Sequence, residues 1–238
     1  MKTIMMLSLL LGGAAYAGAQ VATGGNAIEN QKVLALADLY QSYMGVEAPL
    51  FNGPIYIDYA HTISGNLPFW NGSRDFIKGS VVYNDILYKE VLINYDVYKD
   101  KLLIQHPVNY KIFEIPPQEI TYFEFSGRKF VPLTASEEKL RTGFYELVFA
   151  GHKSVIYGKQ VKELSQDLSE NTTRYHFKNS TVYYVYKEGR PFKITNVKSL
   201  VQAYKNDQVR DFIKSNKPDI KSDFPGTLKS VATYYEKL

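Results

Sequence analysis

The chain has 238 residues, of which 45% are hydrophobic and 22% are charged, a composition that is ordinary for a globular protein. Its formal charge of +4 is too weak for a nucleic-acid-binding protein, which normally carries a dense basic stripe. The chain contains no cysteine, which excludes a disulfide framework, a thiolate metal site, a cysteine nucleophile and a lipid attached through cysteine.

The first residues have the features of a secretory signal peptide. Lys2 is followed by an apolar run at 4–11 and then by the small residues Ala17 and Ala19. The run is shorter than the roughly 20 residues that span a bilayer. We therefore predict a signal peptide at 1–19, cleaved after Ala19 or, as a second choice, after Ala17. The mature chain should have no transmembrane segment and should be periplasmic, outer-membrane-associated or extracellular. The alternative is a buried N-terminal helix.

A helix is expected near the start of the mature chain. Residues 20–27 predict a flexible lead-in. Between 28 and 44 apolar residues recur every three or four positions, which is the spacing of a helix with one apolar face, and Gly45 can end it. We treat 28–238 as a single α+β domain, because no linker rich in Pro, Ser or Gly divides it.

The middle of the chain, 49–195, reads as a series of strands. Runs rich in Tyr, Phe, Val and Ile alternate with turn residues. Asn84-Asp85 is an expected hairpin turn, because both residues tolerate positive φ. Sequential hairpins predict an antiparallel β-meander, as a curved sheet, a partial barrel or a sandwich. The expected strands are 54–59, 80–83, 87–95, 101–105, 120–125, 129–133, 144–149, 154–157, 174–177, 181–187 and 192–194, with a turn at 179–180.

A helical tail is expected at 196–238. Three short apolar stripes have helical spacing, and Lys217-Pro218 separates the second from the third. Asp223 and Pro225 are entry signals for the last helix. Helices this short are not stable alone in water, so we expect them to pack on the sheet or on a partner.

Catalytic and metal-binding signatures are missing from the sequence. The four histidines lie in separate segments without metal-ligand spacing, and no GxSxG, GxGxxG or GxxxxGK[ST] motif occurs. We therefore expect no catalytic residue, no metal and no cofactor. The alternative is a secreted hydrolase of polysaccharide or peptide, whose carboxylates would converge only in the folded chain.

Aromatic residues are abundant, with 20 Tyr and 13 Phe against a single Trp70. Tyrosine on an exposed sheet face can stack on a sugar or anchor a partner, but it also favours strands for packing reasons alone. The segment 65–72, which carries Phe69 and Trp70 between glycines, either caps one end of the core or displays an apolar knob. The candidate residues for binding a ligand or partner are His61, Phe69, Trp70, Tyr83, Tyr88 and Tyr95.

Three pieces of the chain resemble a known family when taken together. They are "LFNGPIYIDY" with "GNLPFW" after it, the meander "GSVVYNDILYKEVLINYDVYKDKLLI", and the stretch from "YYVYKEGRPFKITNV" to the final "ATYYEKL". In this spacing they resemble a family of exported proteins of unknown activity that is widespread in Bacteroidota. The resemblance implies an envelope or secreted location, and it brings no activity, cofactor or catalytic residue. Asn84-Asp85 stands where Asp-Gly or Asn-Gly is usual in that pattern.

These observations predict a non-catalytic exported envelope protein. We expect it to bind a small amphiphilic ligand, a glycan or an envelope protein on or inside the curved sheet, since a concave sheet can enclose a ligand. The absence of catalytic signatures favours binding over the hydrolase alternative.

Overall fold

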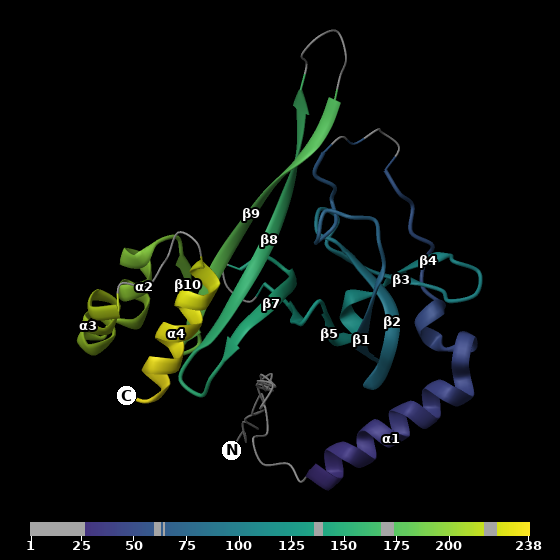
Figure 1. Ribbon diagram of the computed structural model, residues 1–238, viewed down its shortest axis with the longest axis horizontal. Helices are drawn as coiled ribbons and strands as arrows, with labels where there is room; N and C mark the ends of the chain where they lie inside the picture. The colour runs from purple at the N-terminus through teal and green to yellow at the C-terminus, as the bar shows by residue number, and fades with distance from the viewer. Residues whose placement is uncertain (1–26, 60–62, 64, 136–139, 168–173, 217–222) are drawn as a thin grey trace, which may run out of the picture.

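The computed structural model describes residues 27–59, 63, 65–135, 140–167, 174–216 and 223–238. It shows an α+β fold built on one ten-stranded antiparallel sheet (Figure 1). The predicted signal peptide, most of the lead-in, His61 and Lys217-Pro218 lie outside the described residues. The helices are α1 (Ala27–Met44), α2 (Val197–Tyr204), α3 (Asp207–Asn216) and α4 (Phe224–Glu236). The strands are β1 (Ile77–Tyr83), β2 (Ile86–Asp96), β3 (Lys101–Gln105), β4 (Ile112–Ile115), β5 (Ile120–Phe125), β6 (Arg128–Leu133), β7 (Gly143–Ala150), β8 (Val155–Asp167), β9 (Arg174–Lys187) and β10 (Arg190–Ile194).

The sheet consists of two meanders joined edge to edge. Its strand order is β10-β9-β8-β7-β6-β5-β1-β2-β3-β4, so β5 pairs with β1 and not with β4. The chain leaves β4 through the short 3-10 helix Pro117–Glu119 and returns to the other end of the first meander. β5 does not pair with β4, because the segment that contains Pro54 and Tyr56 already occupies the outer edge of β4. There the N–H of Tyr56 donates to Ile112 O at 2.8 Å and the N–H of Glu114 donates to Pro54 O at 2.8 Å.

The first hairpin turn is confirmed. Asn84 and Asp85 have φ of +49° and +60°, which is the conformation that a two-residue turn of type I′ requires. The predicted α+β class, the N-terminal helix and the three C-terminal helices are confirmed as well.

Three details of the predicted strands are wrong. Segment 54–59 is not a strand, because only Ile55 forms an isolated bridge, with Phe113 of β4. The turn expected at 179–180 does not occur, because β8 and β9 pair without interruption from Val155–Tyr186 to Asp167–Arg174. Asn179 and Ser180 are exposed on the hairpin, where polar residues are tolerated in a strand. β4 was not expected at all.

Helices cover the two ends of the molecule. α2, α3 and α4 gather over β7, β8 and β10 at one end, and α1 lies against β2 at the other (Figure 1). Beneath α4, Ile156 and Val185 of the sheet and Leu228 and Val231 of the helix are fully buried. The side of the sheet that faces α1 holds an aromatic core of Tyr95, Phe123, Phe125, Phe130 and Phe144. These aromatic side chains pack together as one buried cluster on the concave side of the sheet.

The glycine-flanked segment 65–72 ties the long β8–β9 hairpin to the end of β2. Asn66 exchanges two hydrogen bonds with Phe177 of β9, through its backbone O at 3.2 Å and its Nδ2 at 3.1 Å. Four residues later, the N–H of Trp70 donates to Tyr95 O at 2.9 Å. Lys162 Nζ of β8 donates to Asn66 Oδ1 at 3.0 Å and also to Leu67 O. The segment therefore caps the core and holds two distant parts of the sheet together.

Candidate functional site: the groove between helix α1 and strand β2

A β-bulge in β2 creates the candidate site. Gly79 of β1 pairs with Val91 and Val81 pairs with Tyr88, so Lys89 and Glu90 together face the single residue between them. Two residues opposing one is the defining feature of a bulge. Glu90 has a φ of +55°, in the left-handed region that non-glycine residues rarely adopt. On the other edge of β2, β3 pairs only with Leu92–Asp96, so Lys89 has no strand partner there among the described residues.

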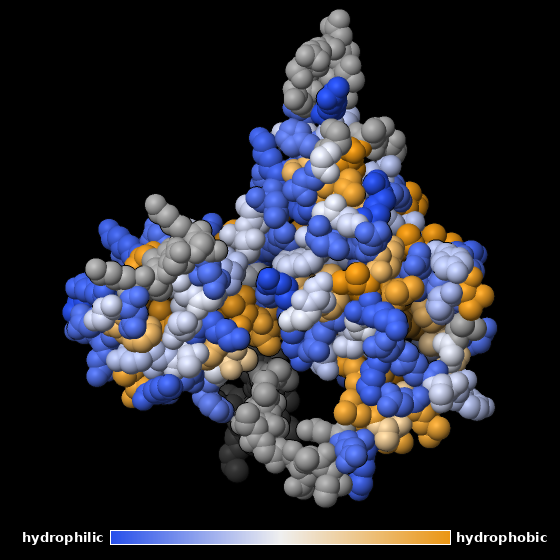
Figure 2. Space-filling view, in the orientation of Figure 1, coloured by the Kyte–Doolittle hydropathy of each residue, from blue (hydrophilic) through white to orange (hydrophobic). Residues whose placement is uncertain are grey.

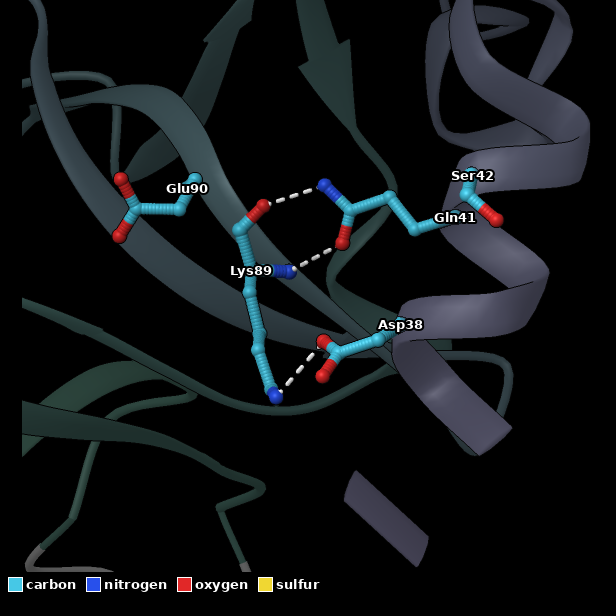
Figure 3. A pocket seen from close by; sticks show the side chains of 5 residues that line it. All are labelled: Asp38, Gln41, Ser42, Lys89 and Glu90. Carbon is cyan, nitrogen blue, oxygen red and sulfur yellow. Dashed lines mark hydrogen bonds and ion pairs between the residues drawn. The ribbon is translucent and has the colours of Figure 1, made fainter. Parts of the chain in front are cut away.

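α1 binds the backbone groups of Lys89 that no described strand pairs with. The carboxamide of Gln41 accepts from the N–H of Lys89 at 2.9 Å and donates through Nε2 to Lys89 O (Figure 3). The ammonium group of Lys89 also pairs with Asp38 Oδ1 at 2.8 Å, one helical turn before Gln41. On the apolar side, Tyr40 meets Tyr88 edge-to-face with 6.1 Å between ring centroids. These contacts fix α1 across the bulge.

Two adjoining shallow, open hollows flank this contact, and together they form what we call the α1–β2 groove. The polar end has a volume of about 250 Å³ and is lined by Asp38, Gln41, Ser42, Lys89 and Glu90, which are drawn in Figure 3. The apolar end has a volume of about 300 Å³ and shares Gln41 and Glu90 with the first. Its other lining residues are Gly45, Ala48, Leu50, Phe51, Tyr88, Val91, Leu92, Gln105 and Pro107. The groove is therefore amphiphilic along its length.

Tyr88 lines the apolar end, and its hydroxyl is buried. The side chain is only 2% exposed, and its hydroxyl has no hydrogen-bond partner among the described residues. Burial raises the pKa of Tyr88, and the neighbouring Tyr40 hydroxyl raises it further. Tyr88 is thus neutral at physiological pH and keeps its proton as a hydrogen-bond donor.

The charged groups of the groove are ion-paired and not arranged for proton transfer. Asp38 is bound by Lys89, and Glu90 Oε2 lies 2.8 Å from Lys78 Nζ on the solvent side. A general acid or base needs a pKa near the working pH and a substrate proton within reach. The groove offers recognition by shape, apolar contact and a few polar groups.

The structure buries most of the predicted binding residues. Phe69, Tyr83, Tyr88 and Tyr95 are at most 7% exposed. Trp70 is half-buried and packs on Phe130 at 4.8 Å between ring centroids, in the same core as Tyr83, Tyr88 and Tyr95. Phe69 lies in a separate cluster with Tyr56 and Leu103. Of the six candidates, Tyr88 alone lines the α1–β2 groove, and His61 is outside the described residues.

Sequence reasoning missed the polar end of the groove. Lys89-Glu90 interrupts the apolar alternation of 87–95, and that interruption is the signal that could have indicated a bulge. Gln41 gave no signal, because its partner lies 48 residues away in the chain.

Carboxylates elsewhere serve the packing of the sheet. Asp96 is fully buried and accepts hydrogen bonds from Tyr56 Oη at 2.7 Å and Tyr59 Oη at 2.6 Å. Asp100 accepts from Tyr95 Oη at 2.5 Å and pairs with Lys159 Nζ at 2.8 Å. Burial is the main cause that raises the pKa of Tyr56, Tyr59 and Tyr95, with these carboxylates adding to it. Within the described ranges, no group of three His, Asp or Glu side chains is placed to hold a metal ion.

No protein-family model, curated protein or solved structure matches the chain. Among the helices that the structure describes, none is both long enough and apolar enough to cross a membrane.

Proposed function

We propose that this chain is a non-catalytic, exported envelope protein that binds an amphiphilic ligand or partner in the α1–β2 groove on its curved sheet. The observation that carries the proposal is that a hollow lined by polar residues and a hollow lined mainly by apolar residues lie side by side and share Gln41 and Glu90. Ligand sites are typically concave and mainly apolar with a few polar groups that fix orientation. The signal-peptide pattern at 1–19 and the resemblance to the exported family of Bacteroidota support a periplasmic, outer-membrane-associated or extracellular location.

The groove suggests how such a ligand is oriented. An apolar chain lies against Leu50, Phe51 and Val91 at one end. A polar headgroup lies at the other, within reach of the ammonium of Lys89 and the carboxamide of Gln41. Tyr88 contributes its ring to the lining of the apolar end. A glycan without an apolar portion fits this arrangement less well.

The hydrolase alternative lacks a supporting observation. It requires two carboxylates that converge on one accessible cleft. Asp96 and Asp100, at the end of β2 and in the turn after it, are held by tyrosine hydroxyls and Lys159. Neither lines the α1–β2 groove.

Calorimetric titration with a single-chain lysophospholipid below its critical micelle concentration tests the proposal. The wild-type protein should bind it with a stoichiometry of one. Gln105→Trp, which adds bulk to the lining of the apolar end, should weaken binding about tenfold or more, equivalent to about 1.4 kcal/mol. Ser180→Trp is the matched control, because Ser180 is exposed on β9 and absent from the lining, and it should bind as the wild type does. Equal affinity of both variants would refute the groove as the site.

A further inference from the structure

The side of α1 that faces away from β2 is apolar and exposed. Leu36 is 66% exposed, Leu39 65% and Tyr43 88%. Figure 2 shows hydrophobic side chains gathered over α1, at the margin of the molecule. In contrast, Ala37 on the docked side is 7% exposed, and Tyr40 packs against Tyr88. The sheet therefore covers the helix around Ala37 and Tyr40, while Leu36, Leu39 and Tyr43 on the opposite side are exposed, as are Val33 and Leu34 nearer the N-terminus of the helix.

The exposed residues form a regular stripe. Lys32, Leu36, Leu39 and Tyr43 are spaced by four, three and four residues, which at 100° per residue places all four within an arc of about 60°. The middle of this arc is about 130° from the docked side. We call these four residues the outer stripe of α1. Alternating steps of three and four residues are the pattern of a helix that packs along another helix.

We propose that the outer stripe of α1 binds the outer stripe of a second copy of this chain, with the two helices antiparallel. The spacing reads the same from either end, so an antiparallel pair places Leu36 of each copy against Leu39 of the other. It also places Lys32 of each copy against Tyr43 of the other, where an ammonium group can lie over an aromatic ring. A parallel pair would instead bring the two Lys32 ammonium groups together, which is unfavourable.

Symmetry supports a second copy as the occupant. A two-fold contact is isologous, so the surface must be complementary to itself, and this stripe is. Binding to a foreign partner or to a lipid surface would not explain why Lys32 and Tyr43 lie at equal distances from the centre of the stripe. Because the stripe covers three helical turns, the contact is smaller than the roughly 1,600 Å² of a standard interface. We therefore expect a weak dimer that depends on protein concentration. This inference is independent of what the α1–β2 groove holds, since it uses another side of the helix.

Sedimentation velocity over a wide range of concentration tests the proposal. The wild-type protein should shift from monomer to dimer as the concentration rises. Leu36→Glu with Leu39→Glu should remain monomeric, because the two substitutions place four carboxylates in the contact. Gln31→Glu is the control: Gln31 is exposed on the same helix, about 110° from the middle of the stripe, and the substitution should leave the dimer intact. A wild-type protein that stays monomeric, or a dimer that survives the double substitution, would overturn the proposal.

The absence of cysteine allows a direct test of the direction of the helices. A mixture of Lys32→Cys protein and Tyr43→Cys protein should form a disulfide between the two variants under mild oxidation. Tyr43→Cys alone should not, since in the antiparallel pair the two positions are about 16 Å apart along the axis, beyond the roughly 7 Å that a disulfide bridges. Cross-linking of Tyr43→Cys with itself, or no cross-link in the mixture, contradicts the antiparallel pair.

Discussion

The carboxamide of Gln41 takes the place of a strand partner for Lys89, accepting from its N–H and donating to its carbonyl oxygen. Main-chain groups without a strand partner must find another partner or be solvated. Because β3 pairs with β2 only from Leu92 to Asp96, α1 supplies the partner for Lys89, next to the bulge. The α1–β2 groove lies where the helix is attached in this way.

Removing the carboxamide should loosen α1. Gln41→Leu replaces the carboxamide with an aliphatic group and leaves both backbone groups of Lys89 without a protein partner. The expected loss in the free energy of unfolding is about 1–3 kcal/mol. Amide hydrogen exchange should accelerate in α1 and stay unchanged in α4. Ser42→Ala, on the same helix, is the control and should change exchange little, because the Ser42 hydroxyl donates within α1 to Leu39 O. Uniform protection in Gln41→Leu would contradict this role.

Glycine at the bulge should relieve backbone strain. Glu90 has a φ of +55°, which costs a non-glycine residue about 1–2 kcal/mol. Glu90→Gly and Glu90→Ala both remove the exposed ion pair with Lys78, and only the glycine variant adopts this φ freely. Chemical denaturation should find Glu90→Gly more stable than Glu90→Ala by about 1 kcal/mol. The reverse order would show that the bulge is not strained.

The partly buried ion pair between Asp100 and Lys159 lies against Gly143, and a larger residue there should destabilise the protein. A β-carbon on Gly143 would collide with the Asp100 carboxylate and lie 2.7 Å from Lys159 Nζ, and the residue has a φ of +146°. Gly143→Ala should destabilise the protein by about 1–3 kcal/mol, because a residue with a β-carbon is strained at this φ and the Asp100 and Lys159 side chains must also shift. Gly189→Ala is the control: its φ is also positive, at +74°, but its β-carbon would meet open space. It should cost only about 1 kcal/mol.

Lys162 should make the stability of the protein depend on alkaline pH. Burial lowers the pKa of Lys162 to about 8, against a partial opposing effect of the Asp96 charge. The unfolded value is about 10.5, so between these values the unfolded chain holds more protons. The free energy of unfolding should therefore rise from about pH 8 towards pH 10. Above that it should fall, because the raised pKa values of Tyr56, Tyr59 and Tyr95 keep those tyrosines protonated only in the folded state.

Denaturation of Lys162→Met across the same pH range checks the origin of this rise. The variant should show a flatter profile between about pH 8 and 10 and the same decline at higher pH. The substitution also removes the hydrogen bonds to Asn66 and Leu67, which lowers the free energy of unfolding at every pH. The quantity to compare is therefore the slope of the free energy of unfolding against pH. An unchanged slope would assign the rise to other groups.

Local chemistry made part of the fold predictable. The turn at Asn84-Asp85 follows from the tolerance of both residues for positive φ, and the C-terminal helices follow from their apolar period and from caps such as Asn196 and Asp223. The pairing of β1 with β5 was not predictable, because it depends on β4 being covered by residues near Tyr56. Asn179-Ser180 misled the prediction because both residues suit a turn, whereas the long register with β8 holds them in a strand.

The candidate site was predictable only through Tyr88. An aromatic count cannot separate tyrosines that pack a core, such as Tyr95, from one that lines a groove. The polar residues of the groove come from two segments that only the fold brings together. For the same reason Trp70, which the sequence marked as a possible exposed knob, is packed against Phe130 in the structure.

Native mass spectrometry of the protein purified from the envelope of its own host, beside Gln105→Trp and Ser180→Trp, tests the central claim most directly. An amphiphile bound in the α1–β2 groove should appear as one discrete added mass on the wild type and on Ser180→Trp, and should be lost from Gln105→Trp. Unliganded masses for all three proteins, or an adduct that Gln105→Trp retains, would contradict the account.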